Sequence, residues 1–220
     1  MRPVPAAPVD GAPEGATRVI AVRHGETAWN AELRIQGHTD IALNARGRWQ
    51  AAQLALALAH EAVQAVYSSD LSRARETAQA YAARAGLAVH VAPGLRERGF
   101  GHFEGRTFAE IETRWPDDAA RWRRREPDFA PGDGESLRDF HRRCVQACAA
   151  LAARHRGQTI LVVAHGGVLD GLYRAATRTA VDAPRSWQLG NATVNRLLHS
   201  DEGFTLIGWN DDQHLAGGGP

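Results

Sequence analysis

Two histidines follow apolar runs that predict buried strands, and each histidine is followed directly by glycine. His24 comes after residues 18–22 and Arg23, and His165 comes after residues 159–163. Because open α/β sheets bind ligands beyond the carboxyl ends of their strands, the two imidazoles would share one crevice if these strands are neighbours. Glycine after each histidine permits a tight turn and offers backbone N–H groups at a helix start, where an anion is favoured. The pattern predicts an anion site that contains both histidines.

A third apolar run, residues 65–67, leads into a helix predicted at Ser72–Ala85 with Ser72 as its N-cap. This helix places Arg73 on its first turn, at the same rim as the histidines if the run is a neighbouring strand. A cation there opposes the helix dipole unless an anion is nearby. Guanidinium groups bind phosphate oxygens through paired N–H donors. Arg23 and Arg73, with the two histidines, therefore predict a pocket for a dianion.

The basic residues exclude several kinds of chemistry. The sequence contains no lysine, so all 26 basic residues are arginine, which excludes Schiff-base lysines, lysine bases and a P-loop lysine. A net charge of +1 argues against a nucleic-acid or membrane-surface binder, because both need a sustained basic field. The histidines show no metal-ligand spacing, so no metal site is expected. Cys144 and Cys148 lie four residues apart in a helical pattern and are expected to be small buried residues.

Strands and helices alternate along residues 18–212, which predicts an α/β fold. We expect a three-layer sandwich with a mostly parallel central sheet and helices on both faces. Residues 107–130 are helical but rich in arginine and are expected to form an excursion from the sheet. The remaining predicted strands are residues 89–91, 193–198 and 204–207, and the remaining predicted helices are residues 45–60, residues 135–154 with Asp133 as cap, and a helix after Gly167.

The two ends of the sequence differ in composition from this domain. Residues 1–17 are rich in proline and lack the apolar core of a signal peptide, which predicts a disordered N-terminal arm. Residues 18–212 are expected to form a single domain, and residues 213–220 a flexible tail. No stretch has the length and apolarity of a membrane span, and cysteine is scarce, so the cytoplasm is the expected compartment. The oligomeric state stays open, with a homodimer as one option.

The segments around the predicted pocket resemble the motifs of the histidine phosphatase (phosphoglycerate mutase-like) superfamily. Five of them follow one another in the order of that family, over about residues 18–210: Arg23-His24-Gly25-Glu26-Thr27 with Asn30, residues 69–78, Leu95-Arg96-Glu97 with residues 100–105, Gly134-Glu135-Ser136-Leu137, and Val163-Ala164-His165-Gly166-Gly167. A lone Arg-His-Gly would be a weak signal, whereas five ordered motifs are a strong one.

The resemblance implies a mechanism and a set of site residues. His24 would attack phosphorus and form a phosphohistidine, which divides the reaction into two displacements. Arg23, Arg73 and His165 would hold the equatorial oxygens, where charge develops in the transition state. Glu97 would protonate the departing oxygen and then accept a proton from water. The family implies no cofactor and no metal. It also implies contacts to substrate or phosphate by three further residues: Asn30, Gln36 and Gly166.

Two arginine-rich segments admit a second interpretation. Arg96, Glu97 and Arg98 could form a solvated salt-bridge face, and surface pairs of this kind contribute little energy. The densest basic patch is interpreted as a solvated helix face rather than as a grip on an extended anionic substrate. Its members are Arg121, Arg123, Arg124 and Arg125, around Trp122.

The favoured function is a metal-independent phosphatase that acts on a small phosphorylated metabolite. The first alternative is phosphoryl transfer of the phosphoglycerate mutase type. Cofactor-dependent mutases of the family carry a long insertion between the Glu and Gly-Glu-Ser motifs, whereas only residues 98–133 separate them here. A more open site, in which water competes well for the intermediate, is therefore expected. The second alternative is a non-catalytic module that binds phosphorylated ligands, for which Glu97 would be dispensable.

Overall fold

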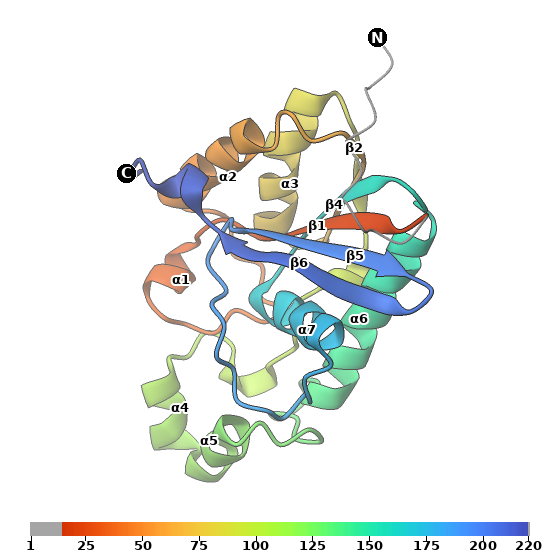
Figure 1. The fold of residues 1–220 in the computed structure, drawn as a ribbon. Helices are drawn as coiled ribbons and strands as arrows, with labels where there is room; N and C mark the ends of the chain where they lie inside the picture. Colours follow the sequence, from red (N-terminus) through yellow and green to blue (C-terminus); the bar gives the residue numbers. More distant parts are fainter. Residues whose placement is uncertain (1–14, 220) are drawn as a thin grey trace.

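Six strands form one sheet in the computed structural model, which describes residues 15–219 (Figure 1). The strands are β1 (Thr17–Arg23), β2 (Val63–Ser68), β3 (Val89–Val91), β4 (Thr159–Ala164), β5 (Val194–Ser200) and β6 (Gly203–Asp211). Their order across the sheet is β3-β2-β4-β1-β5-β6. The three strands that precede the predicted pocket residues, β1, β2 and β4, are thus neighbours at the centre of the sheet.

The sheet is mixed, so the expectation of a mostly parallel sheet is confirmed only in part. β1 to β4 pair in parallel, whereas β5 runs antiparallel to β1 and β6 antiparallel to β5. β5 starts at the carboxyl end of β1, where Ala192 N donates to Arg23 O at 2.9 Å, and must therefore run back along it. A short turn after Ser200 leads into β6, and a tight hairpin can only join antiparallel strands.

Helices cover both faces of the sheet, as expected. They are α1 (Ala28–Ala31), α2 (Ala45–Ala57), α3 (Ser72–Ala85), α4 (Phe108–Arg114), α5 (Pro116–Arg123), α6 (Leu137–Ala153) and α7 (Gly166–Thr177). Side chains of β1 point alternately to the two faces: Val19 and Ala21 pack with α6 and α7, and Ile20 and Val22 with α2 and α3. The three layers follow from this alternation.

Two helix starts differ from the prediction. Leu71, not Ser72, is the N-cap residue of α3, and the N–H and hydroxyl of Ser72 donate to Asp40 Oδ1 at 2.8 and 2.7 Å. A carboxylate from another loop therefore caps this helix, which sequence pattern does not show. α6 begins at Leu137 rather than at residue 135, because the hydroxyl of Ser136, not the side chain of Asp133, accepts from Asp139 N.

The arginine-rich excursion forms a small unit of its own below the sheet (Figure 1). α4 and α5 enclose a separate apolar cluster of Phe103, Ile111, Ala119 and Phe129. Phe108 and Trp122 pack against this cluster. Within residues 15–219, no helix has the length and apolarity needed to cross a membrane.

The ends of the chain are described only in part. Residues 1–14, most of the predicted N-terminal arm, and residue 220 lie outside the described residues. Thr17, which the sequence places in that arm, is the first residue of β1 and donates from its hydroxyl to Ala152 O at 2.8 Å. The predicted flexible tail begins with a 3-10 turn at Gln213–Leu215, and there His214 Nε2 lies 3.0 Å from Ala192 O.

Candidate active site

The carboxyl ends of β1 and β4 bring the two histidines together. Arg23 and Ala164 are register partners, and His24 N donates to Ala164 O at 3.0 Å. As a consequence, the rings of His24 and His165 lie with their centroids 5.2 Å apart. On the other side of β4, Ser69 N donates to Val163 O, so β2 delivers the start of α3 to the same edge. The predicted juxtaposition of strand ends is confirmed.

The ring of His24 is oriented by its own backbone. Its Nδ1 lies 2.7 Å from Gly25 O, and because a carbonyl can only accept, Nδ1 carries the proton in the neutral ring. Nε2 is then left with its lone pair. Burial, together with the charges of Arg23 and Arg73, holds the pKa of His24 well below its usual range. His24 is therefore a neutral imidazole with a free nucleophilic nitrogen near neutral pH.

Arg73 and Arg23 are held by carbonyl oxygens rather than by carboxylates. Arg73 is 0% exposed and donates from Nη1 to Thr39 O and from Nη2 to Gly37 O, at 2.9 and 2.8 Å. Arg23 Nη1 donates to Leu189 O at 2.6 Å. Carbonyl partners fix a guanidinium without neutralising it, so both side chains keep their charge for an anion.

Four buried nitrogen atoms at this edge have no hydrogen-bond partner. They are Nε of Arg23, Nε of Arg73 and both ring nitrogens of His165. Burial and the charges of Arg73, His24 and Arg23 hold the pKa of His165 well below its usual range, so its ring is neutral. Buried polar groups nearly always have partners in native proteins. The Nε–H groups of Arg23 and Arg73 and the single N–H of the neutral His165 ring are orphaned donors, and a phosphoryl group would satisfy them.

Glu97 lies at this pocket and not on a solvated face. Its Oε1 accepts from Arg98 N and its Oε2 from Gly167 N, both at 2.9 Å. The neighbouring arginines have other partners, because Arg96 pairs with Asp70 and the guanidinium of Arg98 donates to backbone carbonyls. The charge of Glu97 instead opposes the lowering of the pKa of Arg23 and of Arg73 by burial. The salt-bridge interpretation of this segment is therefore wrong.

Asn30 and Gln36 belong to one polar network around Thr27. Asn30 Oδ1 and Gln36 Oε1 lie 3.1 and 3.0 Å from Thr27 Oγ1. Asn30 Oδ1 also accepts from Thr27 N and from Asn191 Nδ2, and Asn191 donates to His24 O as well. Because the carbonyl oxygens face inward, the amide NH₂ groups stay available as donors. Asn191 is a member of this network that sequence pattern did not indicate.

Gly25, the glycine after His24, serves close packing rather than anion binding. A Cβ on Gly25 would stand 2.5 Å from Gly47 O, so the loop after β1 can cross the start of α2 only without a side chain. The N–H of Gly25 donates to Thr77 Oγ1 at 3.0 Å and is not free for an anion. Gly166 does begin α7, where a Cβ would lie 3.5 Å from Arg23 Nε.

Glu104 positions the pocket from outside it. Its carboxylate accepts from His38 N and Thr39 N at 2.9 Å and from Thr39 Oγ1 at 2.6 Å. The same loop supplies the carbonyls of Gly37 and Thr39 that hold Arg73. Gly37 has φ +54, and a Cβ there would stand 2.0 Å from Glu104 Oε1. Glu104 was part of a motif in the sequence, but only its contacts show what it does.

No group of three or more His, Cys, Asp or Glu side chains within residues 15–219 is arranged to hold a metal ion.

Comparison with known proteins assigns the family. The model of the histidine phosphatase superfamily (branch 1) matches residues 19–212. The chain belongs to the histidine phosphatase superfamily. The resemblance of the five motifs is thereby confirmed, and the fold agrees with solved structures of the superfamily.

Named relatives of this superfamily member include both mutase-like proteins and phosphatases. The chain is 41% identical over 202 residues to phosphoglycerate mutase-like protein 4 of Arabidopsis thaliana, covering 90% of this chain and 86% of the relative. It is 36% identical over 203 residues to a metal-independent phosphoserine phosphatase of the same plant, covering 91% and 84%. A solved phosphoserine phosphatase of Entamoeba histolytica, in complex with 3-phosphoglyceric acid, matches with a TM-score of 0.82 and 30% identity over 90% of this chain and 99% of that one.

Proposed function

We propose that this protein hydrolyses small phosphomonoesters through a phosphohistidine on Nε2 of His24. The observation that carries the proposal is the state of that ring: buried, neutral and oriented by Gly25 O, with Nε2 free beside the orphaned donors of Arg23, Arg73 and His165. A neutral nitrogen in a cationic pocket is what attack on a phosphate dianion requires. Relatives named as phosphatases support the reaction type.

The reaction would proceed in two balanced steps. In the first, Nε2 of His24 bonds to phosphorus as the ester P–O bond breaks, and Glu97 gives a proton to the departing oxygen. In the second, Glu97 takes a proton from water, the water oxygen bonds to phosphorus, and the N–P bond breaks to release inorganic phosphate. Arg23, Arg73 and His165 would stabilise the equatorial oxygens in both steps.

Hydrolysis is favoured over transfer to a second alcohol by the short connection between the Glu97 and Gly134 motifs. Residues 98–133 form α4, α5 and their turns beside the sheet. A mutase must keep water from its phosphoenzyme, whereas an open pocket lets water act as acceptor. One relative is named phosphoglycerate mutase-like, so the mutase alternative is tested as well. Rapid conversion of 3-phosphoglycerate to 2-phosphoglycerate in the presence of 2,3-bisphosphoglycerate, without phosphate release, would favour the mutase instead.

The test of the proposal compares two esters with different leaving groups. We expect His24→Ala to lower kcat/KM by roughly 10³-fold or more on both phosphoserine and p-nitrophenyl phosphate, because it removes the nucleophile. Glu97→Gln should cost about 10²- to 10⁴-fold on phosphoserine and much less on p-nitrophenyl phosphate, whose leaving group needs no proton. His60→Ala is the control, because His60 is exposed and lies in the turn after α2. A wild-type protein that binds phosphate esters but hydrolyses none of them would indicate a binding module.

A further inference from the structure

His38 is bonded through both its backbone and its ring to one segment, residues 97–104. His38 N donates to Glu104 Oε1 at 2.9 Å, and the ring nitrogen Nε2 lies 2.9 Å from Glu97 O. Because a carbonyl oxygen can only accept, Nε2 carries the hydrogen and donates it to Glu97 O. None of the five motifs of the sequence contains His38. The ring is nevertheless a direct link from the loop of residues 37–39 to the peptide of Glu97.

The loop that carries His38 also holds Arg73. The carbonyls of Gly37 and Thr39, on either side of His38, accept from Arg73 at 2.8 and 2.9 Å. Thr39 N donates to Glu104 Oε2 at 2.9 Å, next to the bond from His38 N to Oε1 of the same carboxylate. Three consecutive residues therefore connect a cation of the phosphate pocket to the segment 97–104.

The carbonyl of Glu97 is held by donors from two different elements. Arg143 of α6 donates from Nη2 to this carbonyl at 3.2 Å, and from Nη1 to Arg96 O at 3.1 Å. Glu135 Oε2 lies 3.9 Å from His38 Nε2, beyond hydrogen-bond distance, and pairs with Arg143 at 2.6 Å. The peptide of Glu97 cannot turn without loss of at least one of the two bonds to its oxygen.

The ring of His38 lies at the surface, over Gly99. A Cβ on Gly99 would stand 3.5 Å from His38 Cε1, which is an ordinary contact distance. Gly99 N in turn donates to Glu135 Oε2 at 3.0 Å. Because 37% of the His38 side chain is exposed, it contributes little to the core, and its substitution should leave the fold intact.

The far end of the excursion is fixed independently of His38. Arg125 donates from Nη2 to Asp170 Oδ2 at 2.9 Å and to Val181 O at 3.0 Å, with a backbone φ of +55. The interpretation of the basic patch as a solvated helix face is therefore wrong for Arg125. It agrees with the other three arginines, which form ion pairs at the surface: Arg121 and Arg124 with Glu126, and Arg123 with Glu112.

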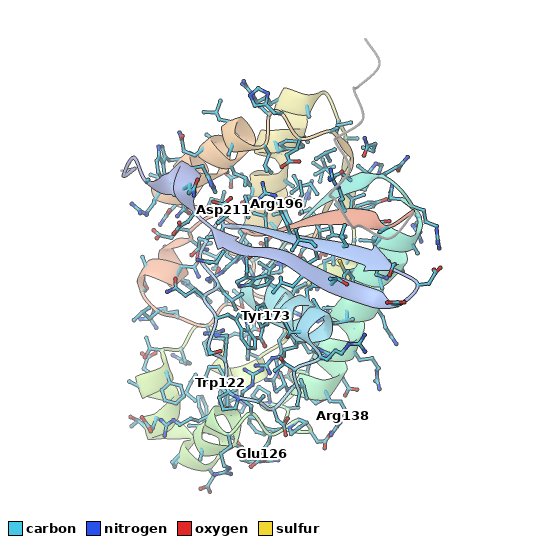
Figure 2. All side chains as sticks on the ribbon, in the orientation of Figure 1. Trp122, Glu126, Arg138, Tyr173, Arg196 and Asp211 are labelled. Atoms are coloured by element: carbon cyan, nitrogen blue, oxygen red, sulfur yellow. The ribbon has the colours of Figure 1, made fainter. Side chains whose placement is uncertain are left out.

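Phe100 joins the segment 97–104 to the excursion. Its ring centroid lies 5.7 Å from that of Trp122 on α5, which Figure 2 shows in the part of the molecule below the sheet. Phe100 N donates to Glu104 Oε1 at 3.0 Å, the atom that also accepts from His38 N. Loss of the His38 ring would therefore leave the excursion in place and release only the peptide of Glu97 on this side.

We infer that His38 is a positioning residue for proton transfer by Glu97. The inference rests on the proposed function, in which Glu97 protonates the departing oxygen. An acid must lie within hydrogen-bond distance of the oxygen that it protonates. Arg98 N and Gly167 N orient the carboxylate, but only while the peptide of Glu97 stays in place. His38 acts through that peptide: it fixes Glu97 relative to the loop that holds Arg73, and so relative to the bound phosphoryl group.

The experiment uses two substitutions of His38 that differ in one hydrogen-bond donor. His38→Phe keeps a planar ring without the donor, whereas His38→Gln keeps an N–H group that can reach Glu97 O. For each protein, kcat/KM would be measured on phosphoserine, whose leaving oxygen needs a proton, and on p-nitrophenyl phosphate, whose leaving group does not. The ratio of the two values is independent of the fraction of folded enzyme, because unfolded molecules lower both equally.

We expect His38→Phe to lower this ratio roughly 10- to 100-fold, through kcat on phosphoserine, because a small displacement of an acid has a cost of this order. His38→Gln should restore most of the ratio. The inhibition constant of inorganic phosphate should not change in either variant, because the backbone that holds Arg73 is still fixed by Glu104. A role of His38 in folding alone would not produce this combination.

His60→Phe is the matched control, because it makes the same exchange at an exposed position in the turn after α2 and should leave the ratio unchanged. An unchanged ratio in His38→Phe would overturn the inference, and so would a His38→Gln variant with a ratio as low as that of His38→Phe. In either case hydrolysis of both esters by wild type would leave the proposed function intact. A wild type that hydrolyses neither ester would remove the proposed function and this inference with it.

Discussion

At the scale of single residues, the pocket depends on keeping two imidazoles neutral among cations. His24 and His165 are 3% and 0% exposed, so water cannot stabilise their protonated forms. Arg23 and Arg73 add repulsion, and both effects lower the two histidine pKa values. The proposed nucleophile, His24, is therefore neutral over a wide pH range, and the protein should lose stability in acid for the same reason.

The loss of stability in acid should be measurable as a pH dependence of the free energy of unfolding. Below pH 6.5 the unfolded chain binds protons at these histidines while the folded chain does not, so the free energy of unfolding falls as pH decreases toward the folded pKa values. Each buried histidine contributes up to about 1.4 kcal/mol of loss per pH unit. The free energy of unfolding would be measured in urea at pH 7.5 and at pH 5.5. Between these pH values it should fall by about 1.4 kcal/mol less for His165→Asn than for wild type. An equal loss in both proteins, with the exposed His60→Asn as reference, would contradict the account.

At the scale of elements, the start of α7 joins His165 to Glu97, two residues with proposed catalytic roles. α7 begins directly after His165, and its Gly167 N–H donates to Glu97 at 2.9 Å. Arg143 of α6 holds the Glu97 segment, because it donates to Glu97 O and pairs with Glu135, which precedes that helix. The orientation of Glu97 is thus fixed by two helices, which lie on the same face of the sheet.

Gly167→Ala should displace Glu97 without unfolding the protein. A Cβ at this position would stand 2.2 Å from Glu97 Oε1 and 2.9 Å from two ring carbons of Phe140, while alanine itself favours a helix over glycine by about 0.5–1 kcal/mol. We expect kcat/KM for phosphoserine to fall roughly 10²-fold or more, and that for p-nitrophenyl phosphate to fall less. Gly208→Ala is the matched control, because no atom lies within 4 Å of a Cβ there. Equal losses on both esters would show that the glycine does not act through the acid.

At the scale of the whole molecule, the buried strands are the part of the fold that the sequence predicts. The runs before His24 and His165 are almost wholly apolar, so the sequence predicts that both strands are buried in the sheet, whereas the structure shows that they are neighbours. The antiparallel edge was not predictable, because it depends on where the loop after α7 returns the chain. Asp40 as cap of α3, and the bond from His38 to the carbonyl of Glu97, are likewise tertiary contacts of loops with no periodic pattern.

The same distinction applies to the site. His24, His165, Arg23 and Arg73 follow strands or begin a helix, so the topology alone gathers them at one edge. Glu97 lies on a loop, so only a motif predicts its place from the sequence. The contacts of its carboxylate with Arg98 N and Gly167 N give its position in the structure. The topology of the sheet therefore determines the position of the pocket that we propose for phosphate, whereas the loops around it determine the position of Glu97.

The most direct test of the central claim is to trap the phosphoenzyme. Wild type and Glu97→Gln would be mixed with p-nitrophenyl phosphate carrying radiolabelled phosphorus, quenched in alkali within milliseconds, digested and sequenced. We predict alkali-stable, acid-labile phosphate on the peptide that contains His24, longer-lived in Glu97→Gln because water attack lacks its base, and absent from His24→Ala. Label on the peptide that contains His165, or turnover with no labelled protein at any quench time, would contradict the account.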